Sequence, residues 1–317
     1  MLKLYNTFMT LQQLKYVEAV ARFKNISKAS EHVFISQPSL TASIQQLEEE
    51  MQIKIFSRKN KGVEITSEGE VFLAYARQVL EQADLLSAHF TGKKEFSPVF
   101  SVSCQHYSFA VNAMVDVIKK FGGNKYNFTL RETQTYEIVE DVARLKSEIG
   151  ILYKSSRNAE IIEKLIKKNE LEFTELFTAS PHVFVSRKNP LSKKEKVTVE
   201  DLEPYPYLVF EQGEHNAFYY SEEPFPAIDR DKTILVRDRA TLFNLLIGLN
   251  GYTVSSGVIS RELNGPSIVS VPFEYDEKMC IGYITKKGLQ LSLYSISYIE
   301  ALKFHCPHEP VQSQTEK

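Results

Sequence analysis

Hydrophobic residues recur at steps of three and four between residues 11 and 47, a spacing that predicts short amphipathic helices. Thr10, Ser27 and Ser36 precede or open these segments, where a hydroxyl oxygen accepts a hydrogen bond from a free backbone N–H. Pro38 fits the first turn of the third helix. The apolar positions are Leu11, Leu14, Val17, Val20 and Ala21 in the first helix and Leu40, Ile44 and Leu47 in the third. Val33 and Ile35 flank the turn before the third helix and are predicted to point inward.

The opposite face of the third helix carries short or amide side chains rather than the lysines and glutamates of an ordinary solvated helix. Such side chains allow close approach to base edges and phosphates. A helix-turn-helix is among the few motifs that indicate DNA as a partner from sequence alone. The predicted contact residues in this region are Ser27, Ser36, Gln37, Pro38, Ser39, Thr41, Ala42 and Ser43.

A basic turn follows the three helices. Two short apolar segments within residues 56–66 flank Arg58, Lys59 and Lys61, a pattern that predicts a hairpin or wing with phosphate contacts at its tip. Residues 1–62 hold nine Lys or Arg and five Glu, a net charge of +4, whereas the whole chain carries −2 and the remainder therefore −6. This asymmetry favours a DNA-binding head on an acidic body.

The motifs of this head resemble those of LysR-type transcriptional regulators. The resemblance rests on Leu11-x-x-Leu14, Ser36-Gln37-Pro38-Ser39-Leu40-Thr41, Ile44-x-x-Leu47-Glu48, Phe56-Ser57-Arg58 and Thr66-x-x-Gly69. One departure is Ala42, where many members of the family have a basic residue. The alternative is a three-helix bundle with a basic loop and no DNA role. Residues 1–8 precede the usual start of the family and represent either an extension or an upstream start codon.

A long helix is expected over residues 66–95, capped by Thr66, before the Gly92–Pro98 segment breaks it. Steps of 4, 3, 4, 3 and 4 form a heptad seam of Phe72, Ala76, Val79, Ala83, Leu86 and Phe90. This seam packs either against the chain's own domains or against a second copy, and the family resemblance favours dimerisation. The predicted divisions are a winged helix-turn-helix over 1–66, a linker helix over 67–95 and an effector domain over 96–317.

From residue 99 onward, strand-like and helix-like segments alternate, which predicts α/β structure with largely parallel sheets. Residues 181–191 and 197–208 resemble the effector domain of the same family, which implies two lobes like those of periplasmic binding proteins, with strands exchanged across a hinge. The fold class is therefore α+β multidomain: a winged helix-turn-helix, a linker helix and a two-lobed α/β domain.

In such sheets a ligand binds beyond the carboxyl ends of strands, near helix N-termini. Hydroxyls, amides and one Arg at these positions favour a small anion or an amino-acid-like carboxylate, with Glu211 available to an ammonium group. For each single residue, helix capping or surface solvation is the alternative. The candidate effector-binding residues are Ser103, Cys104, Gln105, His106, Thr133, Gln134, Thr135, Glu211, Arg239 and Thr241.

Other chemistry is sparse. The three cysteines, Cys104, Cys280 and Cys306, are far apart, and neither a signal peptide nor a transmembrane run is evident, so we expect reduced thiols and a cytoplasmic protein. Cys104 is either a buried thiol or a redox sensor. The His305–His308 segment lacks a second cluster of metal ligands. Without a phosphate-binding loop or nucleophile elbow, the sequence predicts no enzyme activity, catalytic residue, cofactor or metal site.

These features together predict a DNA-binding transcriptional regulator controlled by a small effector. Its expected partners are double-stranded promoter DNA, the effector and further copies of itself, as a homodimer or homotetramer, with no membrane partner. The alternative is a constitutive or architectural DNA-binding repressor whose C-terminal domain only mediates oligomerisation. A ligand-induced thermal shift separates the two.

Overall fold

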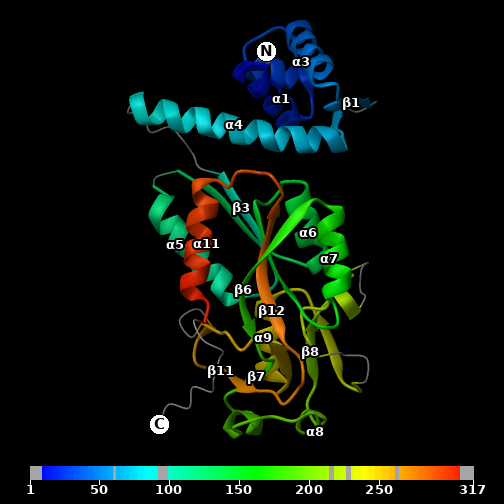
Figure 1. The fold of residues 1–317 in the computed structure, drawn as a ribbon, viewed down its shortest axis with the longest axis vertical. Coiled ribbons are helices and arrows are strands. Elements are labelled where there is room, and N and C mark those ends of the chain that lie inside the picture. Colours follow the sequence, from blue (N-terminus) through cyan, green and yellow to red (C-terminus); the bar gives the residue numbers. More distant parts are fainter. Residues whose placement is uncertain are drawn as a thin grey trace, which may run out of the picture. The chain divides into compact units, whose positions relative to one another are not determined.

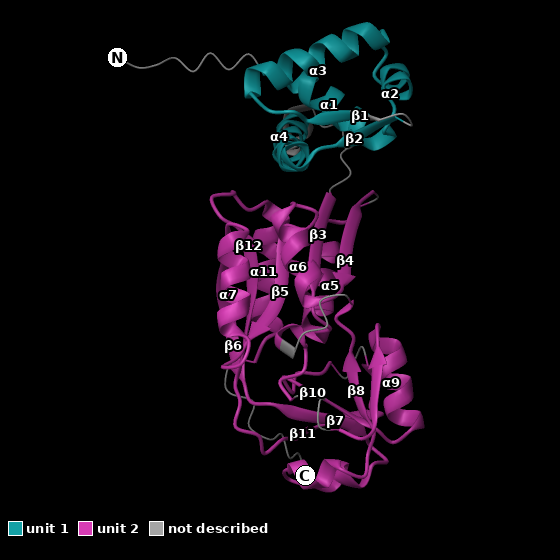
Figure 2. Cartoon of the chain, turned by 90° about the vertical axis from the view of Figure 1, so that its right-hand side faces the viewer, with its two compact units in different colours: residues 1–98 teal, residues 99–317 magenta. Residues whose placement is uncertain are grey.

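The computed structural model describes residues 9–59, 62–91, 99–123, 125–213, 218–225, 230–260 and 264–307. The chain divides into two units, residues 1–98 and 99–317, which are coloured separately in Figure 2. Residues 1–8, Lys61 and the predicted break at residues 92–98 lie outside the described residues, as do the side chains of Arg58, Lys59 and Phe90. The exact boundaries of the three predicted domains therefore stay predictions.

The first unit contains three short helices, a hairpin and one long helix (Figure 1). In chain order these are α1 (Leu11–Phe23), α2 (Ile26–His32), α3 (Gln37–Met51), β1 (Phe56–Lys59), β2 (Gly62–Ile65) and α4 (Ser67–Thr91). The strands pair in an antiparallel register that sets Arg58 opposite Val63 and Lys59 opposite Gly62. The predicted winged helix-turn-helix and long helix are therefore confirmed.

Side-chain caps define the helix starts. Thr10 forms a capping box with Gln13 at α1, and Ser36 accepts from the backbone N–H of Ser39 at α3, both as predicted. The prediction for Ser27 was wrong: Asn25 caps α2, because its side-chain oxygen accepts from the backbone N–H of Lys28. Ser27 lies inside the helix, and its hydroxyl is free to bond elsewhere.

The core of the first unit follows the predicted apolar stripes, with Leu14, Val17, Val20, Leu40 and Leu47 fully buried. Leu11 is the exception, since 47% of it is exposed. Helix α4 adds Leu73, Ala76 and Leu80 to this core, and Ala76 and Leu80 pack with Leu14 of α1.

The second unit has two sheets, and we call the parts built on them lobe 1 and lobe 2. Lobe 1 comprises residues 99–179 and 279–307. In Figure 1, α5 and α11 cover one face of its sheet and α6 and α7 the other. Its strand order is β4 (Asn127–Glu132), β3 (Val99–Cys104), β5 (Ile149–Lys154), β12 (Met279–Lys286) and β6 (Leu171–Ala179). Its helices are α5 (Ser108–Phe121), α6 (Thr135–Ala143), α7 (Ala159–Lys168) and α11 (Leu293–His305).

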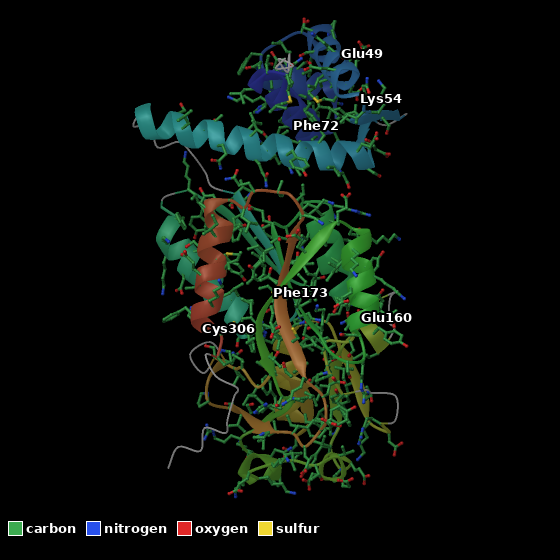
Figure 3. All side chains as sticks on the ribbon, viewed as in Figure 1. Glu49, Lys54, Phe72, Glu160, Phe173 and Cys306 are labelled. Carbon is green, nitrogen blue, oxygen red and sulfur yellow. The ribbon has the colours of Figure 1, made fainter. Side chains whose placement is uncertain are left out.

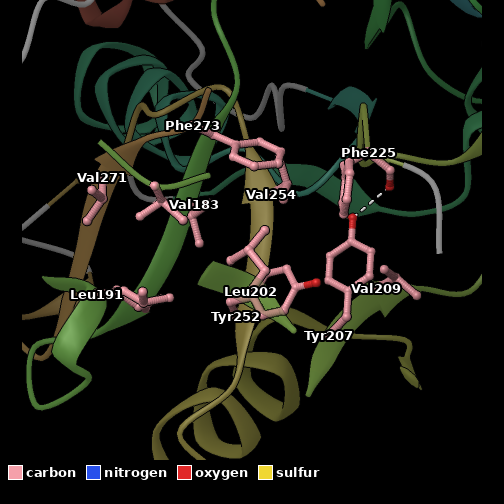
Figure 4. Close-up of a cluster of buried hydrophobic side chains, with 12 residues drawn as sticks. Val183, Leu191, Leu202, Tyr207, Val209, Phe225, Tyr252, Val254, Val271 and Phe273 are labelled. Carbon is pink, nitrogen blue, oxygen red and sulfur yellow. Dashed lines mark hydrogen bonds between the residues drawn. The ribbon is translucent and has the colours of Figure 1, made fainter. Parts of the chain in front are cut away.

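Lobe 2 comprises residues 182–272. Its strand order is β11 (Ile268–Pro272), β7 (His182–Ser186), β10 (Tyr252–Ser255), β8 (Tyr207–Phe210) and β9 (Thr233–Val236). Around the sheet lie α8 (Val199–Leu202), α9 (Arg239–Gly248) and the 3-10 turns η1 (Pro190–Lys193) and η3 (Phe218–Tyr220). Figure 4 shows its core, where the rings of Tyr207 and Tyr252 stack at 4.8 Å and the Tyr207 hydroxyl donates to the Phe225 carbonyl at 2.8 Å.

The prediction of largely parallel sheets was only partly right. Strand β3 runs parallel to β4 and β5, and β8 runs parallel to β9 and β10. Strand β12 is antiparallel to both β5 and β6, and β7 is antiparallel to both β10 and β11. The reason is that the chain crosses between the lobes twice, from β6 to β7 and from β11 to β12. The first strand after each crossing, β7 or β12, runs opposite to its neighbours in the sheet. This exchange confirms the two-lobed fold.

Candidate functional site

The exposed face of α3 begins with Gln37, whose side-chain amide is held by a hydrogen bond. The hydroxyl of Ser27 in α2 donates to the side-chain oxygen of Gln37 at 2.9 Å, and both residues are exposed. This bond fixes the orientation of the Gln37 amide before any partner arrives, and a fixed amide can form the paired hydrogen bonds by which Gln recognises adenine. Ser27 thus contacts Gln37 directly, and the roles of both residues on DNA stay predictions.

The other predicted contact residues of α3 share this end or face of the helix. The hydroxyls of Ser36 and Ser39 bond to one another at 2.8 Å at the start of the helix. Pro38 and Ala42 are exposed, whereas Thr41 and Ser43 are half-buried. Gln37, Pro38, Ser39 and Ala42 are thus exposed in the first part of α3, whereas Leu40, Ile44 and Leu47 are buried.

Glu48 fixes the wing relative to α3, a role the sequence analysis missed. One carboxylate oxygen accepts from the backbone N–H of Ile55 at 2.8 Å and of Phe56 at 3.0 Å, and the other receives Lys54 at 2.9 Å. Glu48 is only 6% exposed. A charged residue beside Leu47 on the buried face of a helix was the feature that could have revealed this role.

The predicted heptad seam of α4 is partly buried and partly exposed. Ala76 is buried against α1, and Phe72 packs against the same core; Figure 3 labels Phe72 on α4. Ala83 is half-buried, whereas Val79 and Leu86 are 43% and 63% exposed. Because a helix that also packs on its own domain turns part of the seam inward, Phe72 and Ala76 are not free for a second copy. Among the described side chains of α4, the large apolar residues that are exposed are Val71, Tyr75, Val79 and Leu86.

Between the lobes lies an open cavity of about 570 Å3, which we call the large cavity. Predicted residues from three strand ends line it: His106 after β3, Thr133 and Gln134 after β4, and Glu211 after β8. The remaining lining residues are Glu132, Tyr136, Glu137, Glu140, Gly213 and Arg237. The described lining therefore holds four carboxylates against one guanidinium, which disfavours a simple anion in this cavity.

A second cavity of about 30 Å3 adjoins it, which we call the small cavity, and His106 lines both. The imidazole Nδ1 of His106 lies 2.9 Å from a carboxylate oxygen of Glu222, and their side chains are 5% and 6% exposed. The His106 ring also stacks on Phe210 at 3.6 Å, with the ring planes 2° apart. His106, in lobe 1, is thus held by Phe210 at the end of β8 and by Glu222 in the segment between β8 and β9.

Two further polar contacts join the lobes. Arg239, at the start of α9, forms an ion pair with Glu132 at the end of β4. Gln212 of lobe 2 accepts from the backbone N–H of Thr135, the first residue of α6, at 3.0 Å. Burial lowers the pKa of Arg239, and Glu132 offsets much of its charge. The charge of Arg239 and the first N–H of α6 are therefore both paired within the chain.

Several predicted effector-binding residues line neither cavity. Ser103 is buried and bonds to Asp141 and Ser147, and Gln105 is buried and bonds to Thr135. Thr241 bonds to Asp238, the N-cap of α9, on the surface. These side chains complete the interior of lobe 1 or cap a helix, so the structure argues against direct ligand contact for Ser103, Gln105, Thr135 and Thr241.

Cys104 is fully buried, and this burial raises the pKa of its thiol to about 12. Oxidation proceeds through the thiolate on an accessible sulfur, and this cysteine offers neither at neutral pH. Among the described residues no group of three His, Cys, Asp or Glu is arranged to hold a metal. In the tail segment, His305 pairs with Asp116 at 2.7 Å and Cys306 is buried, while His308 lies outside the described residues.

Comparison with known proteins fits this geometry. Residues 11–70 match the family described as bacterial regulatory helix-turn-helix protein, lysR family. The chain is 28% identical over 255 residues to the HTH-type transcriptional regulator AlsR of Bacillus subtilis, covering 79% of this chain and 78% of that protein. It is 30% identical over 199 residues to a probable RuBisCO transcriptional regulator of Trieres chinensis, covering 61% of this chain and 62% of that protein.

Residues 11–70 are thus a helix-turn-helix domain of the lysR family, and the chain is similar to LysR-type transcriptional regulators over most of its length. Its fold resembles that of a full-length OxyR variant from Pseudomonas aeruginosa with a TM-score of 0.56 and 19% identity, and the match covers 95% of each chain. The predicted family is thus confirmed, and with it a DNA-binding regulator of LysR type. The relatives just named are regulators rather than enzymes.

The sequence did not reveal two acidic residues that line the small cavity, Glu222 and Glu223. Burial, and then the charge of Glu222, raise the pKa of Glu223 to about 8. Adjacent glutamates directly before Pro224-Phe225, between two predicted strands, were the available indication. In the described part of the chain, no helix has the length and apolar character needed to cross a bilayer.

Proposed function

We propose that this LysR-type regulator alters its binding to promoter DNA when a small molecule bearing both a carboxylate and an ammonium group binds between lobes 1 and 2. The observation that carries the proposal is that His106 belongs to both cavities. On one side it offers N–H donors suited to a carboxylate. On the other side the cavity is lined by Glu132, Glu137, Glu140 and Glu211, which suit an ammonium group.

The charges of the large cavity favour one acceptor for the ammonium group. Glu132 is paired with Arg239, Glu140 with Arg144 and Glu211 with Arg237. Glu137 receives the hydroxyl of Thr133, and within the described chain it has no basic partner. An amino-acid-like ligand would therefore place its ammonium group near Glu137 and its carboxylate toward His106.

A thermal-shift screen of amino acids, acylated amino acids and organic acids on the full chain tests this proposal. A ligand at a hundredfold excess over its Kd should stabilise the protein by about 2.7 kcal/mol. Glu137→Gln should weaken binding of amino acids and leave that of acylated amino acids, which lack the ammonium charge, unchanged. Glu160→Gln, on the exposed surface of α7, is the matched control. A free amino acid that binds Glu137→Gln as tightly as the parent protein would contradict the assignment.

On DNA, we propose that Gln37 contacts bases and that Arg58, Lys59 and Lys61 contact phosphates. If each head neutralises roughly 3–5 phosphates, log affinity against log salt for a dimer should have a slope of about −5 to −9. Gln37→Ala should lose about 1–3 kcal/mol at the specific site only, whereas Arg58→Ala should weaken binding to every sequence. Gel shifts on specific and random DNA check both, and equal losses on the two DNAs would contradict these roles.

We further propose a cytoplasmic homodimer that pairs through the exposed apolar residues of α4. Val71, Tyr75, Val79 and Leu86 recur at helical steps and leave an apolar stripe that a second copy of α4 would cover. Two such dimers would form the tetramer. The alternative function, a constitutive repressor, is favoured by one observation: the lobes are already joined by His106–Glu222, Arg239–Glu132 and Gln212–Thr135 without any ligand. Absence of any stabilising ligand in the screen would support it.

A further inference from the structure

Residues 218–225, in the segment that follows β8, place the carboxylate of Glu222 against His106, just after β3. These residues touch both lobes. Toward lobe 1, the Tyr153 hydroxyl donates to the Ser221 carbonyl at 3.1 Å, and Tyr220 contacts the ring of Tyr136. Toward lobe 2, Glu223 accepts from the backbone N–H of Phe210 at 2.9 Å. Glu222 is therefore held at the boundary of the lobes by its neighbours on either side.

The contacts of Glu222 are those expected for a bound carboxylate. One oxygen accepts from the backbone N–H of His106 at 3.0 Å, and both oxygens lie within 3.0 Å of His106 Nδ1. Glu222 is 7% exposed, and Arg239 lines the same cavity. An amide N–H just after a strand and an imidazole thus hold this carboxylate, in a cavity that Arg239, paired with Glu132, also lines.

The pocket is filled by this side chain. The small cavity that remains beside Glu222 measures about 30 Å3, which is room for only about two water molecules. Because burial and the charge of Glu222 raise the pKa of Glu223 to about 8, Glu223 is mostly protonated at neutral pH.

We infer that the backbone N–H and the imidazole of His106 form a binding site for a small carboxylate, and that Glu222 occupies it as a substitute for the carboxylate of the effector. This inference rests on the proposed function and adds the residue that an incoming ligand must displace. A tethered carboxylate competes at an effective concentration in the millimolar range, so the chain itself sets the threshold for its effector.

Chemical rescue of Glu222→Ala in the full-length protein tests this inference, with acetate as the probe, because acetate replaces the atoms that the substitution removes. We expect Glu222→Ala to show a lowered Tm that acetate raises in a saturable way, by about 3–5 °C at a tenfold excess over its dissociation constant. Chloride at equal ionic strength should have no such effect. The parent protein should not respond over the same range, because its own Glu222 fills the pocket.

Two further variants sharpen the result. Glu222→Gln keeps an amide oxygen that accepts from the His106 N–H, so it should fold and show no rescue. Adding His106→Ala to Glu222→Ala should abolish the response to acetate. If Glu222→Ala is recovered only unfolded, acetate should raise its refolding yield above that in chloride.

An acetate response of Glu222→Ala no larger than that of the parent protein, or an equal refolding yield in the two salts, would overturn the inference. This outcome is distinct from failure of the proposed function. A metabolite screen without hits on the parent protein would contradict effector control, yet acetate rescue would still show that Glu222 occupies a carboxylate site.

Discussion

Replacing Glu48 by Ala tests how the recognition helix and the wing are held in one unit. The change removes the acceptor for two backbone N–H groups, and that of Ile55 belongs to a residue with no exposed surface. A buried donor left without a partner costs about 1–3 kcal/mol, and the bond from the half-buried Phe56 adds about 1 kcal/mol. The Lys54 pair contributes little, because that side chain is 71% exposed. The expected loss is about 2–4 kcal/mol.

Hydrogen exchange of the full-length protein measures this loss locally. A loss of about 2–4 kcal/mol corresponds to exchange roughly 30–1,000 times faster for amides of α3 and the wing hairpin that open together. Amides of lobes 1 and 2 should not change. The altered wing should also weaken DNA binding, although every side chain on the exposed face of α3 is intact.

Glu49→Ala is the matched control. Glu49 is the next residue on α3, it is exposed, and Figure 3 labels it beside Lys54. Its substitution should change stability by less than about 0.5 kcal/mol. Glu48→Gln keeps one acceptor oxygen, so its loss of stability should fall between those of Glu48→Ala and Glu49→Ala. Equal exchange in Glu48→Ala and Glu49→Ala would refute the reasoning, since it would mean that the Ile55 and Phe56 amides do not depend on this carboxylate.

Four other outcomes are expected. The folded-state pKa of Glu223, about 8, exceeds the ordinary value of 4.5. Its stabilising effect is therefore complete below pH 4.5 and lost as the pH rises to 8, so the unfolding free energy of the parent protein should fall by up to about 4 kcal/mol relative to Glu223→Gln between pH 5 and 8. Leu86→Asp should lower the mass measured by light scattering without unfolding the head, because this side chain is 63% exposed in one chain; an unchanged mass would point to another dimer surface. Gly69→Ala should destabilise the head by several kcal/mol in thermal unfolding, because its Cβ would meet the Ile55 carbonyl oxygen at 2.1 Å. Cys104 should resist iodoacetamide at about pH 7.5 until the protein is denatured, as mass mapping would show, and rapid labelling in the native state would restore the redox hypothesis.

The sequence by itself determined the head and the family. Helical periodicity placed the buried faces of α1 and α3, since residues three and four apart necessarily share a side of a helix. Ser36 and Pro38 marked the start of α3 because capping and the missing N–H of proline act within one turn. Alternating strands and helices gave the α/β class of the second unit. All these properties depend on neighbours close in the chain, which is why one sequence was enough.

Tertiary structure decided everything that depends on distant residues. Which half of the α4 seam faces outward was set by its packing on Leu14, far earlier in the chain. Whether Arg239 is a free cation was set by Glu132, and whether the site beside His106 is open was set by Glu222, 116 residues away. A strand end identifies which side chains can meet at a cleft. Only the folded chain shows that its own carboxylate is already bound there.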